Sequence, residues 1–171
     1  MQDSKEVNTE VELSHYFSAS PLKLVIMSLC TFGLYELYWS YKNWVYLKIK
    51  KELTIMPFWR AVFAPLWLYS LLKHLQDEVN DQNIPTALHA GTFAVLYFIS
   101  VALWRLPDPY WLLSYLSFVF LLPANTAILR LSEKSETKIK INNECHGWNW
   151  LAVILGGALF IIAVIETFSS S

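Results

Sequence analysis

The stretch LKLVIMSLCTFGLYELYWSY, residues 22–41, is the first of several apolar runs that decide the class of fold. A helix needs about 20 apolar residues to cross the hydrocarbon core of a bilayer, whereas runs of about 10–14 residues usually lie at its surface or re-enter. One run, residues 61–72, is short and is bounded by Arg60 and Lys73. The runs of sufficient length are 22–41, 87–106, 110–129 and 148–168. The sequence therefore predicts an all-α, polytopic membrane helical bundle with four transmembrane helices and one short amphipathic or re-entrant helix.

The composition agrees with this class. Of the 171 residues, 55% are hydrophobic, and the mean hydropathy is +0.35. Soluble domains contain about 45–50% apolar residues. The net charge of −1 excludes the overall basic surface that nucleic-acid binding requires. We expect a single membrane domain over residues 22–168, preceded by a polar N-terminal tail (1–21) and followed by a short C-terminal tail (169–171).

The placement of lysine and arginine predicts which side each loop faces. Cytoplasmic loops carry an excess of these residues close to the membrane. One basic group follows the run 22–41 and another follows the run 110–129, and both face the same side if the short run does not cross. This predicts that both termini and the turn at 107–109 lie outside and that residues 42–83 are cytoplasmic. The basic residues are Lys42, Lys48, Lys50, Lys51 and Arg60 in the first group and Arg130, Lys134, Lys138 and Lys140 in the second.

The segment around the short run contains two prolines. Pro57 suits the first turn of a helix, where its missing N–H is not needed. Pro65 removes a backbone hydrogen bond and should kink or break the helix. Two interpretations stay open: the segment packs at the membrane interface, or residues 57–75 cross fully with Arg60 and Lys73 reaching opposite interfaces.

An aromatic and basic surface is the first candidate site. Trp side chains gather at headgroup level because the ring is apolar while its N–H needs a polar partner. Basic residues beside them favour anionic headgroups. We predict that this surface contacts lipid or a membrane partner, and the alternative is plain interfacial packing. Its residues are Trp39, Trp44, Phe58, Trp59 and Arg60.

A polar helix face is the second candidate site. Positions three, four and seven residues apart align on a helix. The acid in this face lies inside an apolar run, where acids usually serve function, for example as a proton or cation relay. The alternative is that Glu36 lies near the interface and pairs with Lys42 or Arg60. The face consists of Gly33, Glu36, Ser40 and Asn43.

The sequence predicts no metal site and no cofactor. Its histidines and cysteines lack the spacing of zinc ligands. Cys30 lies within an apolar run and Cys145 in a polar loop, so we expect no disulfide between them. The histidines are His15, His74, His89 and His146, the last adjacent to Cys145.

Two features predict contacts between helices. Asn125, near Pro123, can hydrogen-bond across helices within an otherwise apolar run. Ala152 and Gly156 have the small-xxx-small spacing that lets helices approach closely, within this chain or in a homodimer, and Gly157 lies beside them.

Several short strings together carry a family resemblance: SPLKL (20–24), TFGLYELYW (31–39), YKNW (41–44), PFWRA (57–61) and LPDPYW (106–111). Over residues 16–157 the chain resembles a family of small, uncharacterised multi-pass proteins of bacterial cytoplasmic (inner) membranes. The resemblance implies this localisation and a multi-pass helical architecture. It implies no catalytic residue.

Three functions follow from these features. The favoured one is a non-enzymatic accessory or scaffolding component that binds lipid or a membrane partner, which includes a second copy of the chain. The alternative is a small transporter or channel component that uses the polar face around Glu36. The third, a membrane enzyme acting on lipid, needs acid and base residues that the sequence does not cluster.

Overall fold

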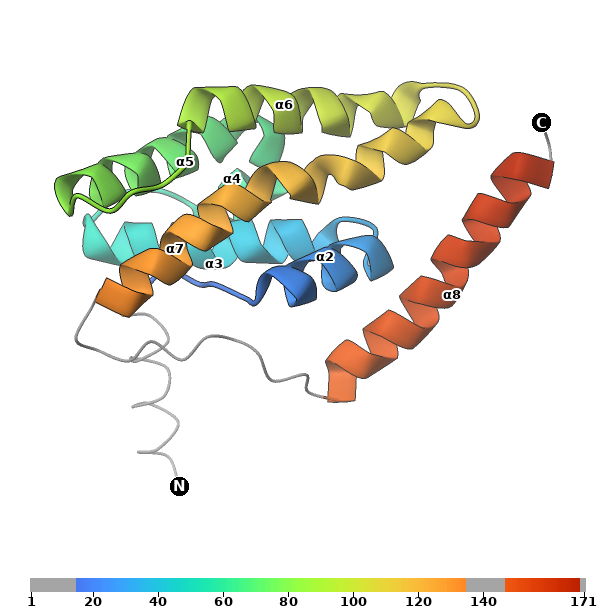
Figure 1. Cartoon of the computed structure of the whole chain (residues 1–171), viewed down its shortest axis with the longest axis horizontal. Helices are drawn as coiled ribbons and strands as arrows, with labels where there is room; N and C mark the ends of the chain where they lie inside the picture. Colours follow the sequence, from blue (N-terminus) through green and yellow to red (C-terminus); the bar gives the residue numbers. More distant parts are fainter. Residues whose placement is uncertain (1–14, 135–146, 170–171) are drawn as a thin grey trace.

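The computed structural model describes residues 15–134 and 147–169, which contain helices and no strand (Figure 1). The all-α prediction is therefore confirmed for this part of the chain. The α-helices are α2 (Pro21–Cys30), α3 (Leu34–Lys50), α4 (Pro57–Val62), α5 (Ala64–Asp81), α6 (Ala90–Ala102), α7 (Leu122–Lys134) and α8 (Gly147–Ser169), and the 3-10 helices are η1 (Leu103–Arg105) and η2 (Tyr110–Leu121).

Two helical stretches are long and apolar enough to cross a membrane, Tyr110–Lys134 and Trp150–Ser169. The first consists of η2 and α7, which follow each other directly, and the winding changes from 3-10 to α next to Pro123. The apolar helix Ala90–Arg105 is shorter. Of the four predicted crossing helices, two thus qualify by length and composition among the described residues, and the remaining two runs form shorter helices.

The first apolar run folds into two helices instead of one. α2 ends at Cys30, and Phe32 (φ 54°) and Gly33 (φ 82°) adopt the left-handed conformation that ends helices. α3 then runs back antiparallel to α2, as Figure 1 shows. The prediction of a single crossing helix over residues 22–41 is therefore wrong, because a left-handed glycine reverses the chain in the middle of the run.

This reversal brings the segments before α2 and after α3 to the same end of the bundle. The rings of Tyr16 and Tyr46 lie 4.3 Å apart, and the Tyr16 hydroxyl donates a hydrogen bond to Glu78 (3.1 Å). The predicted topology, in which the chain crosses the membrane once between residues 20 and 42, is wrong for this reason. We call this the charged end; its charged residues include Lys50, Lys51, Asp77, Glu78, Arg130 and Lys134.

Parts of both basic groups lie at the charged end, namely Lys50 and Lys51 of the first and Arg130 and Lys134 of the second. Arg130 donates a hydrogen bond to the carbonyl of Pro85, and Lys134 donates one to the carbonyl of Gln82. Both carbonyls belong to the loop that follows α5. The described part of the second basic group thus lies at the same end of the bundle as the loop after α5.

The prolines act as the sequence predicts. Pro57 lies in the first turn of α4, and Pro65 lies in the first turn of α5. α4 ends at Val62 and α5 begins at Ala64, so residues 57–75 do not form one continuous helix. α5 is amphipathic and buries a stripe of Leu68, Leu71, Leu72, Leu75 and Val79 against the other helices.

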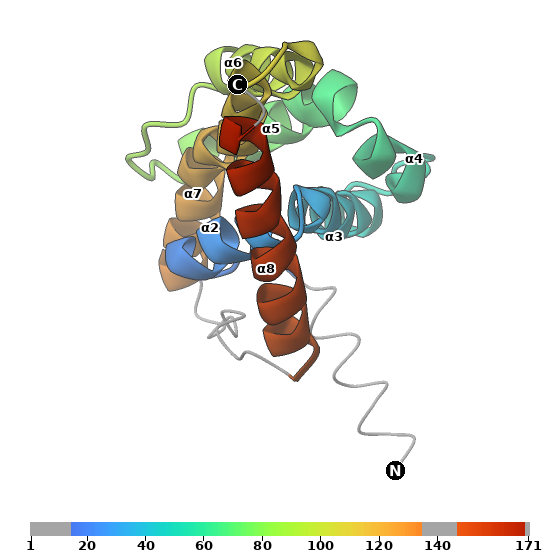
Figure 2. The same cartoon turned by 90° about the vertical axis from the view of Figure 1, so that its right-hand side faces the viewer.

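The long apolar helix α8 packs closely against α2. A Cβ atom placed on Gly156 would lie 1.6 Å from the carbonyl oxygen of Cys30. Phe160, one turn further on, contacts the rings of Phe32 and Tyr115 at centroid distances of 6.5 and 5.1 Å. The close approach expected at Gly156 thus occurs within the chain. Figure 2 shows α8 in front of the bundle, and most of its large apolar side chains are exposed.

We predict that Gly156→Ala loosens the contact between α2 and α8. The added methyl group would overlap the Cys30 carbonyl, and overpacking of this kind costs about 1–3 kcal/mol. Thermal unfolding of the purified protein in detergent measures the loss. Gly157→Ala is the matched control, since its Cβ would lie at an ordinary 3.6 Å from the Cys30 sulfur. Equal unfolding temperatures for the two variants would contradict this packing.

Candidate functional site

A pocket of about 430 Å³ opens at the end of the bundle opposite the charged end. Its walls come from the turn between α2 and α3 and from α4, α6, η1 and η2. Exposed apolar side chains form its mouth, and we call this end the apolar end. The mouth residues are Phe32, Leu34, Val62 and Trp104.

Glu36 lies on the floor of this pocket and is only 3% exposed. The Ser117 hydroxyl lies 2.9 and 3.0 Å from its two carboxylate oxygens and donates to them, and the Tyr97 hydroxyl also hydrogen-bonds to it. Ser28 lines the same pocket, is 2% exposed, and its hydroxyl has no hydrogen-bond partner among the described residues. The floor therefore combines one acid with three hydroxyl groups beneath apolar walls.

The start of α3 explains how Glu36 reaches this position. α3 begins at Leu34, so Glu36 occupies its first turn, where a carboxylate interacts favourably with the helix dipole. Gly33 precedes the helix in a left-handed conformation, and a Cβ atom there would lie 3.9 Å from Glu36 Oε1. Gly33 thus borders the pocket from the turn and is not part of the helical face, because the helix begins after it.

Glu36, Ser40 and Asn43 share the buried side of α3. The Ser40 hydroxyl is buried without a hydrogen-bond partner among the described residues. Asn43, in contrast, is fully engaged: its side chain accepts from the Phe17 amide (2.9 Å) and donates to the carbonyls of Phe17 (3.2 Å) and Trp39 (2.9 Å). Asn43 therefore holds the segment before α2 and is not open to a ligand.

Asn125 on α7 likewise holds the segment before α2, at Ala19. Its side-chain oxygen accepts from the Ala19 amide and from Trp39 Nε1, both at 3.2 Å, and its nitrogen donates to the Ala19 carbonyl at 2.6 Å. The expected hydrogen bond from Asn125 across helices is thus confirmed. The two asparagines thus satisfy backbone groups of Phe17 and Ala19 in the segment before α2.

The predicted aromatic and basic surface is divided by the fold. Trp39 and Trp44 are fully buried, so they do not belong to any lipid or partner surface; α3 lies inside the bundle because the chain reverses before it. Phe58 and Trp59 on α4 are more than half exposed. The Arg60 guanidinium lies 4.5 Å from the ring centres of Trp44 and Trp67, a cation–π arrangement.

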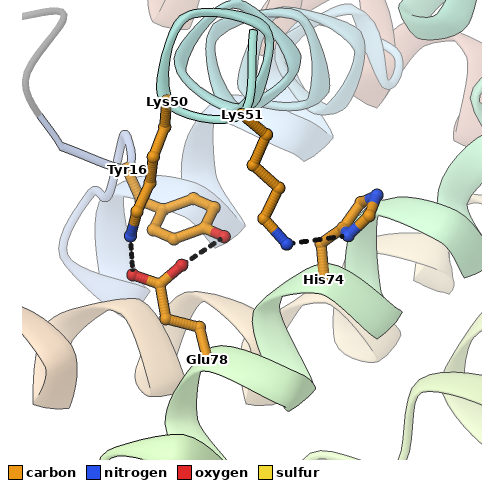
Figure 3. Close-up of polar contacts among 5 residues, drawn as sticks. All are labelled: Tyr16, Lys50, Lys51, His74 and Glu78. Carbon is orange, nitrogen blue, oxygen red and sulfur yellow. Dashed lines mark hydrogen bonds and ion pairs between the residues drawn. The ribbon is translucent and has the colours of Figure 1, made fainter. Parts of the chain in front are cut away.

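The charged end has its own network, shown in Figure 3. Glu78 on α5 accepts from Tyr16 and pairs with Lys50, which ties the segment before α2 to α3 and α5. Lys51 Nζ lies 3.1 Å from His74 Nδ1. Burial, followed by the charge of Lys51, lowers the pKa of His74, so the ring accepts this hydrogen bond in its neutral form. This network anchors chain segments to one another.

No metal site is found in the part of the chain that the structure describes. Cys145 and His146 lie outside the described residues, as do Lys138 and Lys140. In comparisons with known proteins, no family model, no curated protein and no solved structure matches this chain. The resemblance to small bacterial membrane proteins therefore stays a prediction.

The partners of Glu36 are residues that the sequence analysis missed. Ser28 and Ser117 are isolated hydroxyl residues within apolar runs, and Tyr97 lies within a third run. A polar side chain in such a run often faces a partner across helices, and this signal could have marked the two serines. Their meeting with Glu36 depends on how α6 and η2 pack against α3.

We predict that Asn125→Leu destabilises the protein by at least about 2 kcal/mol. The substitution keeps the volume but leaves the Ala19 amide and carbonyl and Trp39 Nε1 without partners, at about 1–3 kcal/mol each. Thermal unfolding in detergent is the measurement. Thr126→Ala is the control, because this exposed hydroxyl bonds only to the Leu122 carbonyl of its own helix. A control that destabilises as much would contradict the role of Asn125.

Proposed function

We propose that this chain is an integral membrane protein that binds a lipid or another amphiphilic molecule in the pocket above Glu36, in a non-enzymatic accessory role. The observation that carries the proposal is a pocket with a polar floor whose mouth is made of exposed apolar side chains. Such a mouth is stable next to hydrocarbon, and a hydrocarbon chain can enter through it. Pockets of a few hundred Å³ with few polar groups are typical of small-molecule sites.

Placement in a membrane is supported by two helices of sufficient length, Tyr110–Lys134 and Trp150–Ser169. Only 6% of the apolar stretch of the second helix is buried inside the molecule, so its apolar side chains need another apolar environment. The family resemblance supports a bacterial cytoplasmic membrane. Exposed Phe58 and Trp59 on α4 support contact with lipid.

We propose further that the charged end faces the cytoplasm, because Lys and Arg gather on that side. The segment before α2 then lies in the cytoplasm, and α8 leads the C-terminus across the membrane. A reporter active only in the cytoplasm should therefore be active when fused before Met1 and inactive when fused after Ser171. Activity at both ends, or only at the C-terminus, would contradict this arrangement.

The pocket is tested by closing its mouth. Val62, 41% exposed, lines the mouth, and Val62→Trp should fill it without disturbing the core. We expect mass spectrometry of protein purified from native membranes in mild detergent to find a bound lipid or amphiphile in the wild type, reduced at least about tenfold in the variant.

Val95→Trp is the matched control, since Val95 is exposed on α6 outside the pocket. It should retain the bound molecule. A stoichiometric protein partner with an empty pocket would instead favour the scaffolding form of the accessory role. Equal loss in both variants would contradict binding in this pocket.

Transport is the second candidate, and one observation favours it. Ser40 lies one turn beyond Glu36 on the buried side of α3 with an unpartnered hydroxyl, which extends the polar groups from the pocket into the bundle. An intramembrane acid with a polar continuation is typical of ion-coupled carriers. Asn43 interrupts this line because it binds the Phe17 backbone.

A further inference from the structure

We infer that the pocket selects amphiphiles with a positively charged head, which pairs with Glu36 while the apolar body lies between the aromatic walls. This inference rests on the proposed function and specifies its ligand. The ligand class is an amphiphile with a positively charged group, such as an ammonium, at the tip of its head and a hydrophobic body.

The first argument is the missing counter-charge. Glu36 is almost fully buried, and among the described residues no Lys, Arg or His forms an ion pair with it. Its partners, Ser117 and Tyr97, are neutral hydroxyl groups. A buried carboxylate without a cation is costly, so it takes up either a proton or a positive ligand. The other titratable groups that line the pocket are Tyr97 and Tyr115, and neither can supply a positive charge.

The second argument is the free hydroxyl of Ser28. It is 2% exposed, lines the same pocket, and has no partner among the described residues. Buried polar groups normally find a partner. An ammonium group bound at Glu36 has N–H groups to spare, and the Ser28 oxygen can accept one of them. The Glu36 carboxylate and the oxygen of the Ser28 hydroxyl can thus both accept hydrogen bonds from a donor head group.

The third argument is the wall of the pocket. Five aromatic side chains line it: Phe32, Tyr97, Trp104, Trp111 and Tyr115. Aromatic faces attract cations and also contact apolar surface, so they suit both parts of such a ligand. An anionic head group would meet the Glu36 carboxylate, which repels it.

The experiment measures binding of radiolabelled tetraphenylphosphonium to the full-length protein in maltoside micelles by scintillation proximity. We expect saturable binding to the wild type and a dissociation constant about 30-fold higher for Glu36→Gln, as for loss of one partner from a buried charge pair. Val62 is exposed, so Val62→Trp should weaken binding only because the larger side chain blocks the mouth of the pocket. A dissociation constant for Glu36→Gln within about twofold of the wild-type value would overturn the inference.

A competition series tests the charge without any substitution. Dodecylamine, protonated at neutral pH, dodecanol and dodecanoate share one chain length and differ in the charge of the head. Only dodecylamine should displace tetraphenylphosphonium from the wild type. Displacement by dodecanol or dodecanoate with equal potency, or no binding of tetraphenylphosphonium, would overturn the inference. A lipid that co-purifies with the wild type and is lost in Val62→Trp would still support the proposed function.

The same assay distinguishes two sources of the cation. If the natural ligand is a lipid with an amine headgroup, phosphatidylethanolamine added to the micelles should compete and phosphatidylglycerol should not. If the ligand is a free hydrophobic amine, neither lipid should compete while dodecylamine does. Both results support a cationic head. Competition by phosphatidylglycerol alone would overturn it.

Discussion

The hydrogen bonds from Asn43 and Asn125 to the backbone of residues 17 and 19 are the constraint on which the rest of the fold depends. The segment before α2 carries buried amide and carbonyl groups that need hydrogen-bond partners. The two asparagine side chains supply these partners at residues 17 and 19. Because Asn43 belongs to α3 and Asn125 to α7, the same bonds fix these helices relative to each other. Trp39 joins them through its bond to Asn125.

The helical class, the effect of the prolines and the close contact at Gly156 could be predicted because each depends on local sequence. Apolar length predicts helices, and a proline ends or starts one wherever it occurs. The first run shows the limit of this reasoning. The length of an apolar run does not reveal that Phe32 and Gly33 within it adopt left-handed conformations. The left-handed turn between two apolar segments therefore replaced an expected crossing helix by a hairpin and brought the segment before α2 to the same end of the bundle as the end of α3.

For the candidate site, helical spacing correctly placed Glu36, Ser40 and Asn43 on one side of α3. Their environments could not be predicted, because these depend on residues distant in the sequence. Ser117 meets Glu36 across 81 positions, and Asn43 meets Phe17 across 26. The prediction that Trp39 and Trp44 lie on a lipid or partner surface was wrong for a related reason. Both residues match the composition of a membrane interface, but α3 is central in the bundle and buries them. Composition indicates which environments a residue tolerates, but it does not predict how deeply the fold buries that residue.

The short hairpin of α2 and α3 has a consequence for the bilayer itself. α2 contains 10 residues, and at about 1.5 Å per residue it is about half as long as the hydrocarbon core is thick. In the proposed membrane placement, such a hairpin would displace lipid from one leaflet only, while α8 would pass through both. The lipids beneath the turn would then have to tilt or thin the bilayer to fill that space.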